Sequence, residues 1–162
     1  MIVVLEGPDL AGKSTLASKL ESQHFGAVIV ENGQPPTGVV LFDHYASQIV
    51  EASGHPNLTV FDRLHLGELI YGPRYRGSAL IDDEQLLVLE RLLDQSGALK
   101  VHVDAADADL LDRHAERGDD FVTSTSDLIQ IAQSYRSLIG SRRVTPGWTR
   151  WSIGESLPCD LT

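Results

Sequence analysis

A glycine-rich turn near the start of the chain carries the residue types that hold phosphate groups. The stretch GPDLAGKS begins at Gly7 and ends with Gly12, Lys13 and Ser14. Glycines let backbone N–H groups turn inward around phosphate oxygens, and a helix that follows adds the positive end of its dipole. A lysine here reaches the terminal phosphates as a point charge, and the adjacent hydroxyl offers an oxygen to Mg²⁺.

This turn matches the P-loop pattern, in which four residues separate the first glycine from Gly-Lys-Ser. It lies between a buried strand predicted over 2–5 and a helix predicted over 12–23, which is the junction that the motif requires. We therefore expect ATP and Mg²⁺ as cofactors. The predicted ATP-binding residues are Gly7, Pro8, Asp9, Leu10, Ala11, Gly12, Lys13, Ser14 and Thr15.

A second polar pair, Asp62 and Arg63, follows the third predicted strand, 58–61. Ligands of open parallel sheets gather outside the carboxyl ends of the strands. An acidic residue there can hold Mg²⁺ through water, and an arginine can bridge donor and acceptor phosphates. We expect Asp62 to join Ser14 at the metal, and Asp62, Arg63 and Lys13 to act in catalysis.

The elements that position these residues alternate along the chain. Short β-branched runs over 2–5, 27–30, 58–61, 98–103 and 148–153 predict five strands, and helical runs lie between them. Helices are expected over 12–23, 38–52, 106–117 and 126–139, from about 64 to a break at Tyr71-Gly72-Pro73, and from Asp82–Asp83 onward. This order predicts one domain, 1–162, an α/β three-layer sandwich with a five-stranded parallel sheet.

Composition excludes several classes of protein. The formal charge of -10 argues against non-specific coating of nucleic acid, because phosphate backbones demand basic surface. The apolar runs are too short to span a bilayer, and the first one lacks the basic flank of a signal peptide. A single cysteine, Cys159, fits a reducing compartment. We expect a cytoplasmic protein with no membrane partner.

Two stretches carry a resemblance to a known family. EGPDLAGKST followed by FDR resembles the thymidylate kinase and deoxynucleoside kinase group, and FDRLHLGELIYGPRYRG most resembles small thymidylate-kinase-like proteins of bacteriophages. The resemblance implies transfer of the γ-phosphate of ATP to a deoxynucleoside monophosphate, thymidylate, in the host cytoplasm if a phage encodes the chain. It also implies that Asp9 meets the sugar or the acceptor end of the substrate, and that Arg63 contacts the transferring phosphoryl group or the acceptor phosphate. A homodimer is compatible with the family.

In such kinases a helical lid, here about 106–125, closes over the phosphates and delivers arginines. Arg113 and Arg117 lie four apart, on one helical face, and Gly118 is a candidate hinge. We expect both arginines to stabilise charge on the transferring group. An ordinary surface helix with salt bridges is the alternative.

The acceptor side offers further candidates. By resemblance to deoxynucleoside kinases, Glu31 is a candidate general base, with a solvated loop carboxylate as the alternative. Arg74 and Arg76 would form an anion clamp if their segment is extended, because residues two apart then point the same way. His65 and Tyr71 are candidates for acceptor contact, with core packing as the alternative. The predicted substrate-binding residues are Asp9, Glu31, Arg63, His65, Tyr71, Arg74 and Arg76.

Two other functions stay open. The first is phosphorylation of a hydroxyl, on a deoxynucleoside or on a 5-hydroxymethylpyrimidine in DNA, with Glu31 or Asp62 as base; the acidic charge disfavours the DNA version. The second is a nucleotide-binding regulator that is not a kinase. No guanine-reading Asn-Lys-x-Asp motif supports it.

Overall fold

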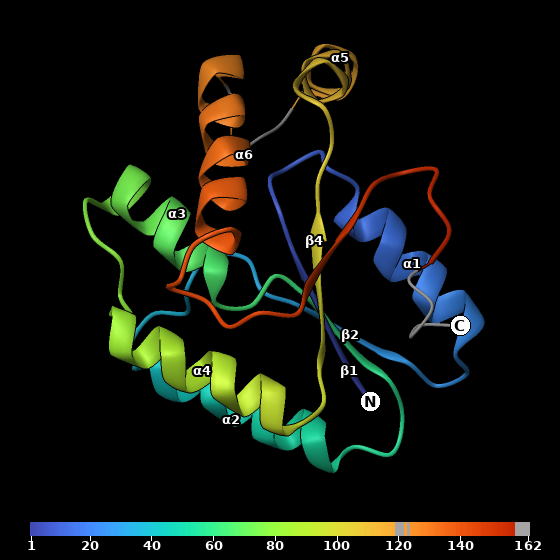
Figure 1. Cartoon of the computed structure of the whole chain (residues 1–162), viewed down its shortest axis with the longest axis vertical. Helices are drawn as coiled ribbons and strands as arrows, with labels where there is room; N and C mark the ends of the chain where they lie inside the picture. Colours follow the sequence, from blue (N-terminus) through green and yellow to red (C-terminus); the bar gives the residue numbers. More distant parts are fainter. Residues whose placement is uncertain (119–121, 123, 158–162) are drawn as a thin grey trace.

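The computed structural model describes residues 1–118, 122 and 124–157 and contains one parallel sheet of five strands (Figure 1). Six helices accompany the sheet in this part of the chain, so the predicted α/β sandwich is confirmed. The strands are β1 (Ile2–Glu6), β2 (Val28–Glu31), β3 (Thr59–Asp62), β4 (Leu99–Val103) and β5 (Trp148–Trp151). The helices are α1 (Lys13–Gln23), α2 (Leu41–Gly54), α3 (Leu66–Arg76), α4 (Asp83–Gln95), α5 (Asp107–Arg117) and α6 (Thr125–Ile139).

The strand order β2-β3-β1-β4-β5 brings the two predicted motifs together. β1 lies between β3 and β4, and its Leu5 pairs with Asp62 of β3. The turn after β1 and the Asp62–Arg63 pair therefore leave the same edge of the sheet from neighbouring strands. This is the place where parallel sheets bind ligands.

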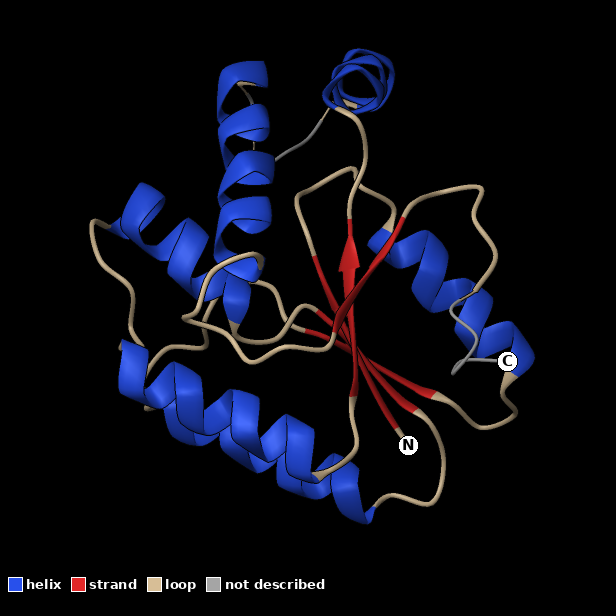
Figure 2. Cartoon of the chain, viewed as in Figure 1, coloured by secondary structure: helices blue, strands red, loops and turns tan. Residues whose placement is uncertain are grey.

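Alternate residues of β1 face two separate cores, which gives the molecule its three layers (Figure 2). Val3 and Leu5 belong to a core that includes apolar residues of α1 and α6. Ile2 and Val4 belong to a second core with α2 and α4, which run side by side on the other face. A strand buried on both faces is the expected state of a central parallel strand. No helix in the described ranges is long and apolar enough to cross a membrane.

The predicted break at Tyr71-Gly72-Pro73 is wrong, since α3 continues through Pro73 to Arg76 and ends before Gly77, whose φ is 83°. The residue before a proline normally avoids helical angles because its Cβ clashes with the proline ring. Gly72 has no Cβ, and a Cβ there would lie 2.7 Å from Glu68 Oε1. Glycine thus lets the helix pass the proline and pack tightly on the neighbouring side chains.

Other boundaries shift by one to three residues. β2 and β3 each begin and end one residue later than predicted, so Glu31 and Asp62 are the last residues of their strands. α2 begins at Leu41, because Gly38 has a φ of 79° and Val40 is extended. Asp82 caps α4 and forms a capping box with Gln85, as its acidic start predicted. Cys159 and residues 119–121 and 123 of the predicted lid lie outside the described residues.

Candidate active site

The turn after β1 has the backbone of a phosphate cradle. A Cβ on Gly7 would lie 2.0 Å from the carbonyl oxygen of Val103, so only glycine fits against β4. Gly12 has a φ of 110° and stands at the N-terminus of α1. The first N–H groups of a helix have no partners within the helix and attract anions. This backbone geometry is compatible with the anion site that the sequence predicts at the first strand–helix junction.

Lys13 is folded back over this cradle. Its Nζ donates to the carbonyl oxygens of Gly7, at 3.0 Å, and Pro8, at 2.7 Å, and the residue is only 6% exposed. Burial, together with the charge of Arg63, lowers the pKa of Lys13 to about 8. When a triphosphate binds, its charged oxygens can replace these two carbonyl oxygens as acceptors of the Lys13 hydrogen bonds, and they are the stronger acceptors.

Ser14 and Asp62 meet as the metal prediction requires. The Ser14 hydroxyl donates to Asp62 Oδ2 at 3.1 Å, and Asp62 Oδ1 is buried without a hydrogen-bond partner among the described residues. Hard oxygen ligands of this kind suit Mg²⁺, which usually takes one or two protein ligands and completes its shell with water and phosphate. Within the described ranges no group of three or more His, Cys, Asp or Glu gathers as an all-protein metal site. The oxygens of Ser14 and Asp62 are therefore suitable ligands for Mg²⁺.

Arg63 holds an unusual backbone conformation that aims its side chain at the P-loop. Its φ is 65°, a region that non-glycine residues rarely adopt. The Arg63 N–H donates to Leu5 O at 2.9 Å, and its carbonyl accepts from Asn32 Nδ2 at 3.1 Å. Gln48 in turn donates to Asn32 Oδ1 at 3.1 Å. Strain of this sort persists where the surroundings fix it, and it is common at functional sites.

Glu6, the last residue of β1, secures the turn that follows Arg63. The residue is fully buried, and its Oε1 accepts from the backbone N–H groups of Leu64 and Leu66, each at 2.9 Å. Tyr135 of α6 donates to its Oε2 at 3.1 Å. One carboxylate thus ties the strand before the P-loop to the start of α3 and to α6.

Asp9, Arg63 and Tyr71 form one cluster. Arg63 donates to Asp9 Oδ1, Tyr71 donates to Asp9 Oδ2 at 2.7 Å, and the Arg63 guanidinium lies 5.3 Å from the centre of the Tyr71 ring. Burial alone would raise the pKa of Asp9, but the charges of Arg63 and Lys13 and these hydrogen bonds outweigh it and lower that pKa. Arg63 Nε is buried without a hydrogen-bond partner in the described part of the chain.

Two cavities meet at this cluster. The P-loop cavity, about 420 Å³, is lined by Asp9, Leu10, Gly12, Lys13, Ser14, Thr15, Asp62, Arg63, Arg113, Arg117 and Ile153. The α2–α3 cavity, about 260 Å³, is lined by Asp9, Asn32, Gly33, Gln34, Pro35, Tyr45, Arg63, Leu64, Gly67, Glu68, Tyr71 and Arg76. Asp9 and Arg63 line both. A group bound in one cavity can therefore meet a group bound in the other at these two side chains.

The arginines of α5 face the P-loop cavity. Arg113 Nη1 donates to Leu10 O at 2.9 Å, and Arg117 also lines this cavity. At the base of α5, Arg136 of α6 contacts both Asp104, at 3.0 Å, and Asp107, at 2.7 Å. Arg136 thereby fixes the segment between β4 and α5 that sets where the two α5 arginines lie.

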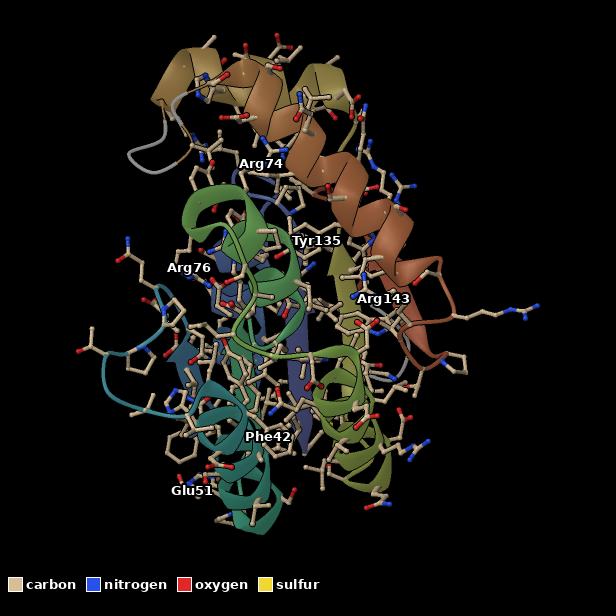
Figure 3. All side chains as sticks on the ribbon, turned by 90° about the vertical axis from the view of Figure 1, so that its left-hand side faces the viewer. Phe42, Glu51, Arg74, Arg76, Tyr135 and Arg143 are labelled. Atoms are coloured by element: carbon tan, nitrogen blue, oxygen red, sulfur yellow. The ribbon has the colours of Figure 1, made fainter. Side chains whose placement is uncertain are left out.

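The predicted clamp of Arg74 and Arg76 is wrong, because both residues lie on helix α3 and not on an extended segment. The two side chains take different partners on different sides of α3 (Figure 3). Arg74 contacts Asp127 and Gln130 of α6 and does not line the α2–α3 cavity. Arg76 does line it, paired with Glu68. Residues two apart on a helix point about 200° apart, so a shared anion site cannot form there.

Two other predicted residues lie away from the cavities. His65 is fully buried and bonds to Glu90 at 2.8 Å, so it has no access to a ligand and the core-packing alternative holds. Glu31 is exposed and lines neither cavity; the residues that follow it, 32–35, line the α2–α3 cavity instead.

Sequence reasoning missed Glu6, Asn32, Glu68, Tyr135 and Arg136. Glu6 and Glu68 were detectable as carboxylates inside otherwise apolar runs, since a charge in a buried strand or helix needs a specific partner. Asn32, Tyr135 and Arg136 act through contacts with residues 16 to 129 positions away, and no local pattern marks them.

Comparison with known proteins supports the fold. No family model matches the chain. It is 24% identical over 160 residues to the SPbeta prophage-derived uncharacterized protein YorR of Bacillus subtilis (strain 168), covering 95% of this chain and 93% of that one. The crystal structure of YorR in complex with phosphorylated GDP matches with a TM-score of 0.73 and 22% identity, over 94% of this chain and 85% of that chain.

Two kinase structures also match. Deoxyadenosine kinase from M. mycoides, solved with dCMP and dCDP, gives a TM-score of 0.56 at 14% identity, over 94% of this chain and 90% of that chain. Polyphosphate kinase 2 from Arthrobacter aurescens TC1 gives a TM-score of 0.60 at 17% identity, over 92% of this chain and 59% of that chain. The fold is that of P-loop kinases. Likeness at these identities shows the fold and leaves the activity to the site.

Proposed function

We propose that this protein is a P-loop phosphotransferase that moves the γ-phosphate of ATP to a nucleoside or nucleotide bound in the α2–α3 cavity. One observation carries the proposal: Asp9 and Arg63 line both this cavity and the P-loop cavity. Phosphoryl transfer needs donor and acceptor in line across a short gap, with charge on the moving group neutralised. The junction at Arg63 supplies both conditions.

The residues of the two cavities have different roles according to where they lie. The P-loop N–H groups and Lys13 hold the triphosphate, and Ser14 and Asp62 would hold Mg²⁺, which when bound neutralises phosphate charge. Arg63 contacts the moving group from the acceptor side, while Arg113 and Arg117 face it from α5. The acceptor lies against Tyr71 and the 32–35 segment.

The acceptor class follows from the sequence and from the relatives. The motifs resemble those of thymidylate kinases, which makes thymidylate the first acceptor to test. YorR was solved with phosphorylated GDP, and one structural relative is a deoxyadenosine kinase solved with nucleotides. Guanosine and deoxyadenosine compounds therefore belong in the same panel, together with DNA that contains 5-hydroxymethylpyrimidine. YorR is prophage-derived by name, which supports a phage setting and the host cytoplasm as the place of action.

The experiment is transfer of label from γ-³²P-ATP, with Mg²⁺, to deoxynucleosides, their 5′-monophosphates and modified DNA, with Lys13→Ala as the negative control. We expect a labelled product that depends on the acceptor, and a loss of about 10²-fold or more in turnover for Lys13→Ala, because its charge on the phosphates is gone. Phosphate release without any acceptor dependence would favour the regulator instead. Ordinary activity of Lys13→Ala would refute the donor site.

A further inference from the structure

We infer that the acceptor reacts through an uncharged hydroxyl group and that Asp9 is the general base that takes its proton. This inference rests on the proposed phosphotransferase activity and names the chemistry of its acceptor. It replaces Glu31 and Asp62, the bases expected from the sequence, with a carboxylate of the P-loop itself.

The charges of the α2–α3 cavity balance without a ligand. Its two arginines are Arg63 and Arg76, and each is paired with a carboxylate of the same cavity, Asp9 and Glu68. Glu68 is 4% exposed and also accepts from the Leu80 N–H at 2.7 Å, so it is fixed in place. A phosphate dianion would enter a site with no net positive charge and would compete with buried carboxylates for the same guanidinium groups. An uncharged acceptor meets no such cost.

Asp9 is the carboxylate in the right place. Among the described residues, the acidic side chains that line the α2–α3 cavity are Asp9 and Glu68, and those that line the P-loop cavity are Asp9 and Asp62. Both oxygens of Glu68 bond to Arg76, and Asp62 faces Ser14. Asp9 therefore stands where an acceptor oxygen would approach the γ-phosphate.

The hydrogen bonds of Asp9 leave room for a proton. Arg63 occupies Oδ1 and Tyr71 occupies Oδ2, and a carboxylate oxygen has lone pairs for a second partner. The acceptor O–H donates to Asp9, and its proton passes to the carboxylate as the new O–P bond forms and the bond from the γ-phosphorus to the β,γ-bridging oxygen breaks. ADP leaves with that electron pair. A weak base suffices, because kinase transition states are loose and an aspartate serves in protein kinases.

Arg63 links the proton transfer to Asp9 with the transfer of the phosphoryl group. Its Nη2 holds Asp9, and Arg63 also lines the P-loop cavity, where its guanidinium can meet an oxygen of the moving phosphoryl group. The backbone of Arg63 is fixed by Asn32 and Leu5, so the pair is already in position before a ligand binds. Pre-organised groups of this kind lower the barrier without further ordering.

The test compares Asp9→Asn with wild type and with Asp43→Asn, a matched removal of an exposed carboxylate on α2. Calorimetry first measures binding of each deoxynucleoside and its 5′-monophosphate to wild type; the nucleoside should bind at least about tenfold more tightly. With the best hydroxyl acceptor, Asp9→Asn should lower kcat by about 10²- to 10⁴-fold, while the Kd for MgATP changes less than about threefold. Asp43→Asn should match wild type.

A 5′-amino-5′-deoxynucleoside separates a base from a merely structural residue. In the free-amine form, which has already lost one proton to water, its nitrogen attacks with a lone pair and releases a second proton to water afterwards, so at equal free-amine concentration Asp9→Asn should cost less than about tenfold with this acceptor. Equal losses with both acceptors would overturn the role as base. Loss in Glu31→Gln with activity kept in Asp9→Asn would place the base on β2.

The outcomes also distinguish this inference from the proposed function. If 5′-monophosphates bind more tightly than nucleosides, or if phosphate is transferred only to 5′-monophosphates, the inference of a hydroxyl acceptor is overturned. The proposed phosphotransferase activity is then still supported. If wild type transfers phosphate to no acceptor, the proposed function fails, and the binding preference still decides whether the cavity selects an uncharged compound.

Discussion

Replacing Glu90 with glutamine should lower the free energy of unfolding by about 3 kcal/mol at pH 6 and by only about 1 kcal/mol at pH 3. Glu90 is fully buried on α4, and its carboxylate accepts from side chains of three other segments. His65 Nε2 lies 2.8 Å from Oε1, while Lys100 Nζ at 3.2 Å, the Thr145 hydroxyl at 2.8 Å and Trp148 Nε1 at 3.3 Å surround Oε2. Because His65 precedes α3, this cluster also supports the turn that carries Arg63.

The magnitude follows from the pKa of Glu90. Burial alone would raise it, but the hydrogen bond and attraction of His65, the Thr145 hydrogen bond and the charge of Lys100 outweigh burial and lower the pKa from 4.5 to about 2. Each pKa unit corresponds to about 1.4 kcal/mol. The folded-state pKa is the lower one, so the stabilisation is complete above about pH 4.5 and is lost as the pH falls toward 2. Glutamine cannot titrate, so the difference between the two proteins carries this pH dependence.

Urea unfolding of both proteins at pH 6, 4 and 3, followed by circular dichroism, measures the difference directly. Glu51→Gln on α2, an exposed carboxylate, is the matched control and should stay within about 0.5 kcal/mol of wild type at each pH. A difference for Glu90→Gln below about 1 kcal/mol at pH 6, or one that does not change between pH 6 and pH 3, would refute the reasoning.

Three further predictions concern the site. Burial and the charge of Arg63 lower the pKa of Lys13 to about 8, so Lys13 loses its charge as the pH rises from 7 to 9. Calorimetry should therefore find MgATP bound about tenfold more weakly at pH 9 than at pH 7. An unchanged affinity would contradict this prediction. Arg117→Ala should lower kcat by about 10²- to 10³-fold with little change in the KM for acceptor, and a selective rise in that KM would move Arg117 away from the transferring group. Asp62→Asn should raise the Mg²⁺ concentration for half-maximal activity by about tenfold, and an unaltered Mg²⁺ titration would remove Asp62 from the metal site.

Local sequence determined the donor half of the site. The local sequence motif marks the glycines of the P-loop and the helix that begins at Lys13, although the close approach of Gly7 to Val103 of β4 is a tertiary contact. The register of β1 with β3 then brings Asp62 to Ser14, as the predicted parallel sheet requires. Alternation of strands and helices was enough to predict that edge of the sheet.

The acceptor half depended on tertiary contacts. The path of α3 through Pro73 rests on the packing of Gly72 against Glu68 and Ala79, and that path separates Arg74 from Arg76. The pairs Arg63–Asp9 and Arg74–Asp127 join side chains far apart in the chain, whereas Arg76 pairs with Glu68 of the same helix.

The sequence by itself therefore determined the position of the candidate triphosphate site, because a phosphate cradle is built from consecutive backbone groups. Only the tertiary structure decided the charge of the facing cavity and moved the candidate base from Glu31 to Asp9. The physical reason is that electrostatic pairing acts over a few ångströms in space, between residues such as Asp9 and Arg63 that lie 54 positions apart in the chain.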